Sequence, residues 1–194
     1  MTSEINSKIN PAEIYRERKL IWKLAKNDFK TKFAGSYLGT IWAFVQPVIT
    51  IFVYWFVFEK ALGSGTQTMR SGIDAPFVIW LMAGLVPWFF FQDAMNGGTN
   101  ALLEYNYLVK KVVFKINILP VVKIISNLFV HLFFLCVALV ICCAYGMHPD
   151  WYTLQVFYYA ICMILLATGL VYATSAIVVF FRDMAQIVGI ALQI

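Results

Sequence analysis

The chain has 194 residues, of which 61% are hydrophobic and only 13% are charged, and its formal net charge is +5. A soluble domain typically carries about 25% charged residues. The composition therefore excludes an ordinary soluble domain and favours a chain that resides in lipid.

The few charged residues are concentrated between long apolar runs. Residues 33–58, 75–92 and 151–181 contain no charged residue, and 124–149 contains only two histidines. Each run reaches or approaches the ~20 residues that cross a bilayer. Backbone polar groups in lipid must be paired within the segment, so the runs should be helices. We predict an all-α polytopic membrane protein with four complete spans, at about 40–58, 76–92, 120–145 and 151–180.

A fifth apolar run begins after Asp183 and reaches the last residue of the sequence, Ile194. Residues 184–194 are too few to cross a bilayer, so we expect them to be the start of a fifth span. The chain is accordingly expected to be the front part of a longer protein. We divide it into an N-terminal region, 1–34, and a transmembrane domain, 35–194.

Lysines and arginines alternate between the two sides of the predicted spans. Residues 1–39 hold eight, 59–74 two, 104–123 four, 146–150 none, and the connection after the fourth span holds Arg182. Positively charged connections are retained on the cytoplasmic side. The N-terminus, the loop 104–123 and the turn at Arg182 are therefore predicted to be cytoplasmic.

The segment from Ile14 to Phe33 is predicted to be an amphipathic helix that lies on the membrane surface. Its apolar residues share one arc of the helix, and lysines run along the flank, where they reach lipid phosphates. The arc comprises Ile14, Ile21, Trp22, Ala25, Phe29 and Phe33, and the lysines are Lys19, Lys23, Lys26 and Lys30. A basic flank that only sets the orientation is the alternative.

Two glycines precede the first span, and a glutamine and a proline lie within it. Gly35 and Gly39 permit a turn between the surface helix and the span. Pro47 removes a backbone hydrogen bond, and Gln46 brings an amide that needs a partner. A simple kinked helix is the alternative interpretation.

The first span is also rich in aromatic residues. Rings near its ends fit the interfacial belt. Rings nearer the middle fit a path for sugars, whose C–H faces stack on aromatic rings. The candidates for such a path are Trp42, Phe44 and Trp55. From periodicity alone, packing against lipid or other helices is the favoured explanation.

The second span carries Pro87 and is followed by a polar stretch that remains helical in character. Gly97 and Gly98 interrupt this stretch, and adjacent glycines are typical of a helix break. We therefore expect the helix to break there.

Residues that carry chemistry are scarce. His131 is alone in a span, and His148 lies in a turn beside Asp150. There is no Walker-type phosphate loop. The spans lack the acidic and basic residues that gradient-driven carriers keep near the midplane. We predict that the chain is not an enzyme, holds no metal or cofactor, and draws its energy from elsewhere.

Three segments, in this order, resemble the transmembrane permease of bacterial ABC exporters for O-antigen, teichoic acid and capsular polysaccharide. They are KFAGSYLGTIWAFVQP (Lys32–Pro47), LVKKVVFKINILP (Leu108–Pro120) and VVFFRDMAQIVGIALQI (Val178–Ile194). The resemblance implies an ABC type-2 permease of the bacterial inner membrane, with six spans in a full-length subunit and two copies per exporter. It implies separate nucleotide-binding subunits that hold ATP and Mg, a lipid-linked polysaccharide as substrate, and no nucleic acid.

The resemblance also gives the basic loop 104–119 a role as a coupling helix that docks on the ATPase. Leu108, Val112 and Ile116 recur every four residues and form an apolar face for such a partner. The implied coupling residues are Tyr107, Leu108, Val109, Lys110, Lys111, Val112 and Phe114, with Arg182 and Asp183 as a second contact. The implied gate or hinge residues are Gly35, Ser36, Tyr37, Gly39, Gln46 and Pro47. A loop that only sets orientation is the alternative.

One position departs from the family pattern. Lys115 follows Phe114 where family members commonly carry proline, although Pro120 is retained. Without the first proline the coupling helix is free to continue, so its end point is left open.

Three other functions stay open at this point. A permease of the same superfamily for a drug or a lipid would be distinguished by its genomic neighbours, since glycosyltransferase genes favour polysaccharide. A membrane-bound transferase of envelope synthesis would need catalytic acids or histidines facing a cavity. A structural scaffold is opposed only by the three resembling segments.

Overall fold

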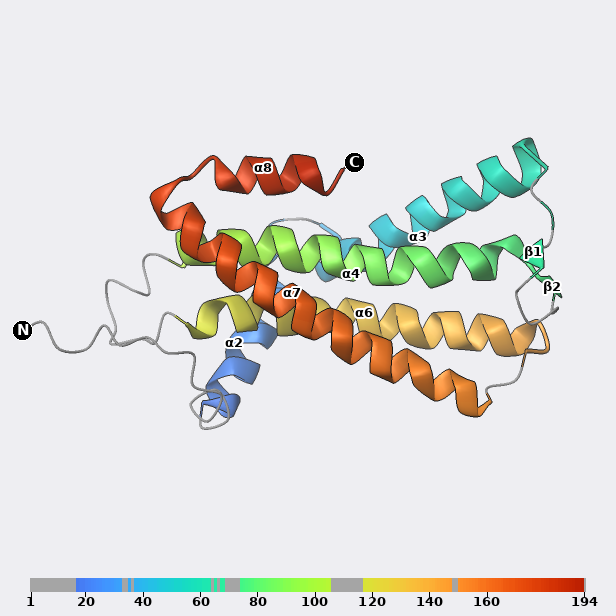
Figure 1. Cartoon of the computed structure of the whole chain (residues 1–194), viewed down its shortest axis with the longest axis horizontal. Coiled ribbons are helices and arrows are strands. Elements are labelled where there is room, and N and C mark those ends of the chain that lie inside the picture. The colour runs from blue at the N-terminus through green and yellow to red at the C-terminus, as the bar shows by residue number, and fades with distance from the viewer. Residues whose placement is uncertain are drawn as a thin grey trace, which may run out of the picture. The chain divides into compact units, whose positions relative to one another are not determined.

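The computed structural model describes residues 17–32, 35, 37–63, 65, 67–68, 74–105, 117–147 and 150–193. Its long elements are all helices, and the predicted all-α fold is confirmed (Figure 1). The helices are α2 (Arg18–Thr31), α3 (Trp42–Trp55), α4 (Phe77–Glu104), α6 (Ile118–Ala144), α7 (Gln155–Phe180) and α8 (Met184–Ala191).

Short elements extend or connect these helices. The helical turn η1 (Gly39–Ile41) precedes α3, the π-helical segment η2 (Phe56–Ala61) prolongs it, and η3 (Trp151–Leu154) precedes α7. The strands β1 (Gln67–Thr68) and β2 (Asp74–Ala75) pair antiparallel, with Gln67 opposite Ala75. They form a small hairpin between α3 and α4.

Among the residues that the structure describes, four helical segments are long and apolar enough to cross a bilayer, and the chain is a multi-pass membrane protein. They are Gly39–Ala61, Phe77–Glu104, Ile118–Ala144 and Trp151–Phe180. The second runs well past the predicted end at residue 92, because its polar last turns continue the same helix. In the predicted fifth span, α8 has eight residues.

The expected break at Gly97 and Gly98 is wrong. Helix α4 continues through Pro87 and through both glycines as far as Glu104. A glycine in a helix costs roughly 1 kcal/mol relative to alanine, which a packed helix tolerates. Packing explains the glycine at position 98, since a Cβ there would lie 2.7 Å from Cγ2 of Val171. The glycine therefore admits α7 at close range instead of ending α4.

The chain divides into two compact units. The first comprises Met1–Thr31, Gln92–Asn127 and Ile164–Ile194, and the second comprises Lys32–Phe91 and Leu128–Met163. Helices α4, α6 and α7 each contribute one part to either unit. The first unit holds the predicted interface helix and the ends of the predicted coupling loop.

Helix α2 packs on the beginning of α6 in the first unit. Ile21 and Ala25 of α2 are buried against Ile118 and Val122 of α6. Lys19, Lys23, Lys26 and Lys30 are exposed. Trp22, which belongs to the predicted apolar arc, is 57% exposed. One part of the apolar arc of α2 therefore packs against α6, and another part, at Trp22, is exposed.

In the first unit α7 also crosses α4 near Gly98 (Figure 1). Beside that glycine, the hydroxyls of Thr99 and Thr174 form a buried hydrogen bond of 2.8 Å between the two helices. Thr174 also bonds the carbonyl of Leu170 in its own helix, at 3.0 Å. Close backbone approach and this bond together fix where the helices cross.

The second unit has its own core. Met82 and Val86 of α4 and Phe134 of α6 are buried together, and Phe44 of α3 packs against them. The ring of Phe44 lies edge-on to that of Phe133, with centroids 4.7 Å apart. Aromatic and aliphatic packing thus attaches α3 to the first half of α4 and the second half of α6.

Candidate functional site

The structure describes both stems of the predicted coupling segment. Residues 106–116 lie outside the described residues, and with them the predicted coupling residues Tyr107, Leu108, Val109, Lys110, Lys111, Val112 and Phe114. The first stem is the end of α4, at Glu104 and Tyr105. The second stem is Asn117 and the first turns of α6.

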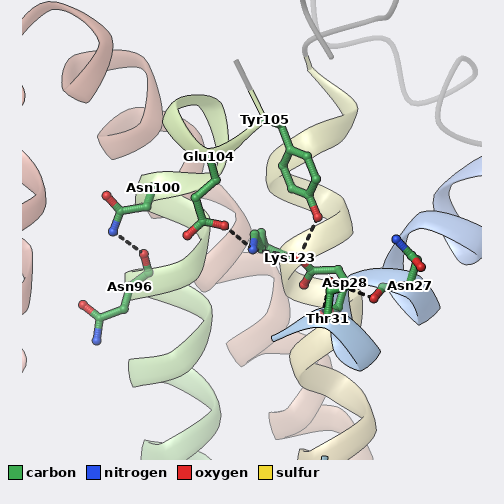
Figure 2. A network of polar contacts seen from close by, with 8 residues as sticks. All are labelled: Asn27, Asp28, Thr31, Asn96, Asn100, Glu104, Tyr105 and Lys123. Carbon is green, nitrogen blue, oxygen red and sulfur yellow. Dashed lines mark hydrogen bonds and ion pairs between the residues drawn. The ribbon is translucent and has the colours of Figure 1, made fainter. Parts of the chain in front are cut away.

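Four side chains join these stems to α2, as Figure 2 shows. We call Asp28, Glu104, Tyr105 and Lys123 the stem cluster. Lys123 reaches from α6 to Asp28 of α2, with 2.7 Å between Nζ and Oδ1, and to Glu104 of α4, with 2.5 Å between Nζ and Oε2. Tyr105 donates its hydroxyl to the same Asp28 oxygen at 2.6 Å. One carboxylate therefore binds a group from each stem.

Burial makes the two ion pairs unequal. The Lys123 and Asp28 side chains are 12% and 7% exposed, whereas that of Glu104 is 52% exposed. A charge buried away from water needs a close partner of opposite sign. Loss of either residue of the Asp28–Lys123 pair would therefore leave an uncompensated buried charge. The Lys123 ammonium also lies 5.3 Å from the centroid of the Tyr105 ring, within range of a cation–π contact.

The second stem has a separate attachment to α7. The hydroxyl of Tyr172 donates to the backbone carbonyl of Asn117 at 2.7 Å. The residue just before the segment is therefore bonded to α2, and the residue just after it to α7. Segment 106–116 leaves from a fixed base made of four helices.

The stem cluster was not predicted from the sequence, although two signals point to it. Asp28 follows Ile21 and Ala25 at the spacing of one helix face, so an acid continues the apolar stripe of α2. The second signal is Lys123, which lies five residues inside α6 in an otherwise apolar turn. A charge in an apolar stripe needs a partner of opposite charge, and Asp28 and Lys123 form an ion pair with each other.

The predicted second contact, Arg182 and Asp183, lies in the turn between α7 and α8. Both side chains are exposed. The Asp183 carbonyl accepts the backbone N–H groups of Gln186 and Ile187, each at 3.0 Å, which begins α8. The side chains remain accessible to a partner.

The predicted hinge lies at the start of the second unit, which begins at Lys32. Gly35 has φ +95° and Gly39 has φ +50°, in the left-handed region that favours glycine. Tyr37 between them is exposed, while Ser36 lies outside the described residues. The backbone at these two positions explains why glycine is required, and the hinge motion stays a prediction.

Gln46 and Pro47 lie within α3, which continues through the proline. The Gln46 side chain is exposed, and its backbone carbonyl accepts the Thr50 hydroxyl at 3.0 Å. Pro47 has no N–H to donate to the carbonyl of Ala43, four residues earlier in the helix, and the Thr50 bond, which goes to Gln46, does not replace that missing bond.

The three aromatic residues proposed for a sugar path have different surroundings. Phe44 packs against Phe133 and Phe134 of α6. The Trp55 indole donates to Glu59 at 2.6 Å, and Lys60 lies 5.5 Å from its ring centroid. Trp42 is 40% exposed. Phe44 thus has a packing role, while Trp42 and Trp55 keep accessible surface.

A protein-family model described as "ABC-2 type transporter" matches residues 19–194, nearly all of the chain. The chain belongs to the ABC-2 type transporter family. The resemblance seen in the three sequence segments is thereby confirmed. The match begins within α2, so nearly all of this helix and the whole stem cluster are parts of the family domain.

Relatives of this ABC-2 type chain carry names that refer to transport. A Myxococcus xanthus protein named "O-antigen export system permease protein RfbA" is 31% identical over 177 residues, which cover 91% of this chain and 65% of the relative. Two Klebsiella pneumoniae proteins of the same name are each 26% identical over 180 residues, 90% of this chain and 65% of theirs. The chain therefore spans about two thirds of the length of these relatives.

Proposed function

We propose that the chain is the permease subunit of an ATP-driven exporter that moves a lipid-linked polysaccharide across the bacterial inner membrane. The observation that carries this proposal is the family match over residues 19–194, together with three relatives named for O-antigen export. A glycan chain cannot cross lipid unaided, because each of its hydroxyls would lose hydrogen bonds to water. A multi-pass protein supplies the path.

The motor is a separate nucleotide-binding subunit that holds ATP and Mg, and segment 106–116 is where it attaches. The stem cluster supports this role, because it joins both ends of the segment to α2. A push on the segment then moves Asp28 and Lys123 together, since separating them would leave a buried charge without its partner. Arg182 and Asp183 offer a second, exposed contact for the same subunit.

A second copy of the chain completes the exporter, and the N-terminus faces the cytoplasm. The charge series of the connections supports this orientation. In the transport step, ATP closes the paired motor subunits, and the turn at Gly35 and Gly39 lets α2 and the first span shift. Trp42 and Trp55, which keep accessible surface, line the glycan path, and α2 rests on membrane lipid.

Substitutions in the apolar face of the segment test the attachment of the motor. Leu108→Asp and Val112→Asp place a carboxylate where the proposal puts an apolar contact, whereas Asn106→Asp adds the same charge on the opposite side of a helix. Each variant is expressed in its host and purified through a tag, and the ATPase that copurifies is quantified together with surface polysaccharide. Leu108→Asp and Val112→Asp should lose most of both, and Asn106→Asp should keep them.

Two outcomes decide separate parts of the proposal. Full copurification and export with Leu108→Asp and Val112→Asp would exclude segment 106–116 as the coupling element. A deletion strain with normal surface polysaccharide and no lipid-linked glycan retained at the inner membrane would exclude polysaccharide as the cargo.

A further inference from the structure

One side of α2 carries a row of lysines. They follow one another at intervals of four, three and four residues, a spacing that places them on one face of a helix. We call them the lysine stripe: Lys19, Lys23, Lys26 and Lys30. Their side chains are exposed, and the row extends for about 16 Å along the helix axis. Helix α2 therefore presents a continuous line of positive charge.

The described part of the chain does not neutralise this charge. Among the described residues, no carboxylate forms an ion pair with an ammonium group of the lysine stripe. Asp28, the acidic residue of α2, lies on the opposite, buried side of the helix and pairs with Lys123. The lysine stripe is therefore available to an anionic partner.

The packing of α2 places the lysine stripe at the level of lipid headgroups. Ile21 and Ala25 hold the other side of the helix against Ile118 and Val122 of α6. Ile118 is the first residue of a segment that is long and apolar enough to cross a bilayer. The end of such a segment lies where hydrocarbon gives way to headgroups. The first span, Gly39–Ala61, also starts only eight residues after the end of α2.

Trp22 adds a second property of a membrane-surface helix. It is 57% exposed and lies on the helix circumference between the packed side and the lysine stripe. Tryptophan is enriched where a membrane meets water, and lysine stems lie along apolar surface while their ammonium groups reach outward. An acidic protein surface would account for the lysines alone, whereas a lipid accounts for the lysines and the tryptophan together.

We propose that the lysine stripe binds the headgroups of anionic phospholipids, with Trp22 in the adjoining interfacial layer. Each basic residue near an anionic membrane surface favours binding by about fivefold, equivalent to about 1 kcal/mol, whereas a zwitterionic phospholipid has no net charge to attract it. This inference rests on the proposed function, in which α2 lies on membrane lipid, and adds the class of lipid that α2 selects. Because Asp28 is on the other side of α2, the lipid contact also holds this helix against the base of segment 106–116.

Photolabelling in bilayers of defined composition tests the site. The protein is reconstituted in phosphatidylcholine that contains a small fraction of phosphatidylglycerol with a diazirine near its headgroup, or of phosphatidylcholine with the same diazirine. Labelled peptides from residues 17–32 report contact with α2. Unlabelled phosphatidylglycerol and unlabelled phosphatidylcholine serve as competitors, each at low and at high salt.

Two sets of substitutions separate charge from shape. Glutamine at all four positions of the lysine stripe removes the charge, and arginine at the same positions is the matched control because it keeps the charge. In the wild-type protein the phosphatidylglycerol probe should label α2 preferentially, and the preference should weaken as salt screens the exposed charges. The preference should fall about tenfold or more with glutamine and stay within about twofold with arginine. The glutamine variant is Lys19→Gln with Lys23→Gln, Lys26→Gln and Lys30→Gln.

Three results would overturn the inference. Equal competition by the two unlabelled lipids in the wild-type protein would show that α2 accepts any phospholipid, and this comparison needs no variant. An unchanged preference in a folded glutamine variant would place the anionic-lipid site elsewhere. A glutamine variant that keeps the lipid preference but no longer copurifies the ATPase would assign the lysine stripe to the motor. The labelling requires no motor, ATP or glycan, so its failure is distinct from failure of the proposed function.

Discussion

Lys123 of α6 and Asp28 of α2 form an ion pair with 2.7 Å between Nζ and Oδ1, and both side chains are almost completely removed from solvent. The pair attaches the N-terminal helix to the base of the segment that we propose to bind the motor. Lys123 pairs with a second carboxylate, that of Glu104, which is half exposed. The two ion pairs of Lys123 therefore contribute differently to stability.

Asp28→Asn should destabilise the protein far more than Glu104→Gln, although both remove one carboxylate from Lys123. Breaking a buried pair typically costs about 3–5 kcal/mol, whereas an exposed pair contributes about 0–1 kcal/mol. Thermal unfolding in one detergent would rank the two variants. The double variant Asp28→Asn with Lys123→Met should recover much of the loss, because it leaves no buried charge. Equal unfolding temperatures for Asp28→Asn and Glu104→Gln would contradict the assigned burial.

Gly98→Ala should destabilise the crossing of α4 and α7, because the new Cβ would lie 2.7 Å from Cγ2 of Val171. Overpacking of this kind typically costs about 1–3 kcal/mol. Gly97→Ala is the matched control, since its Cβ would meet its nearest atoms at 3.7 Å. Unfolding of both variants, and of Gly98→Ala combined with Val171→Ala, measures the effect. If Val171→Ala does not restore the stability of Gly98→Ala, the destabilisation does not come from the contact with Val171.

Thr99→Val should cost about 1 kcal/mol, because it removes a buried bond between α4 and α7. Thr174 keeps its bond to the Leu170 carbonyl, so its hydroxyl is not left alone. A double-mutant cycle with Thr174→Val should give a coupling energy of the same order. Thr168→Val is the control, since that hydroxyl donates to the Ile164 carbonyl of its own helix, α7. Strictly additive effects of the two substitutions would argue against a direct bond.

Tyr172→Phe should loosen the second stem without unfolding the protein. The substitution removes the 2.7 Å bond to the Asn117 carbonyl and keeps the ring, at a cost of about 0.5–1.5 kcal/mol. Hydrogen exchange should quicken in the first turn of α6, with a slight fall in unfolding temperature. Tyr158→Phe, at an exposed position of α7, serves as the comparison. Unchanged exchange at the start of α6 would show that this bond does not hold the stem.

The spans were predictable because the membrane leaves the backbone little choice. The apolar runs that contain Trp42, Trp88, Leu135 and Leu165 all lie within helices long enough to cross a bilayer. The break expected at Gly97–Gly98 was wrong because glycine shows where close approach is permitted and does not show what approaches. Val171 is far away in the sequence and gives no local sign of the contact.

The sequence by itself determined that this is a helical membrane protein of the ABC-2 type, since hydrogen-bond satisfaction in lipid and three short segments are local properties. Only the tertiary structure decided which residue faces which: that Asp28 pairs with Lys123 and that Thr99 meets Thr174. Periodicity identifies a buried face but not its partner, because the partner is set by how distant helices cross.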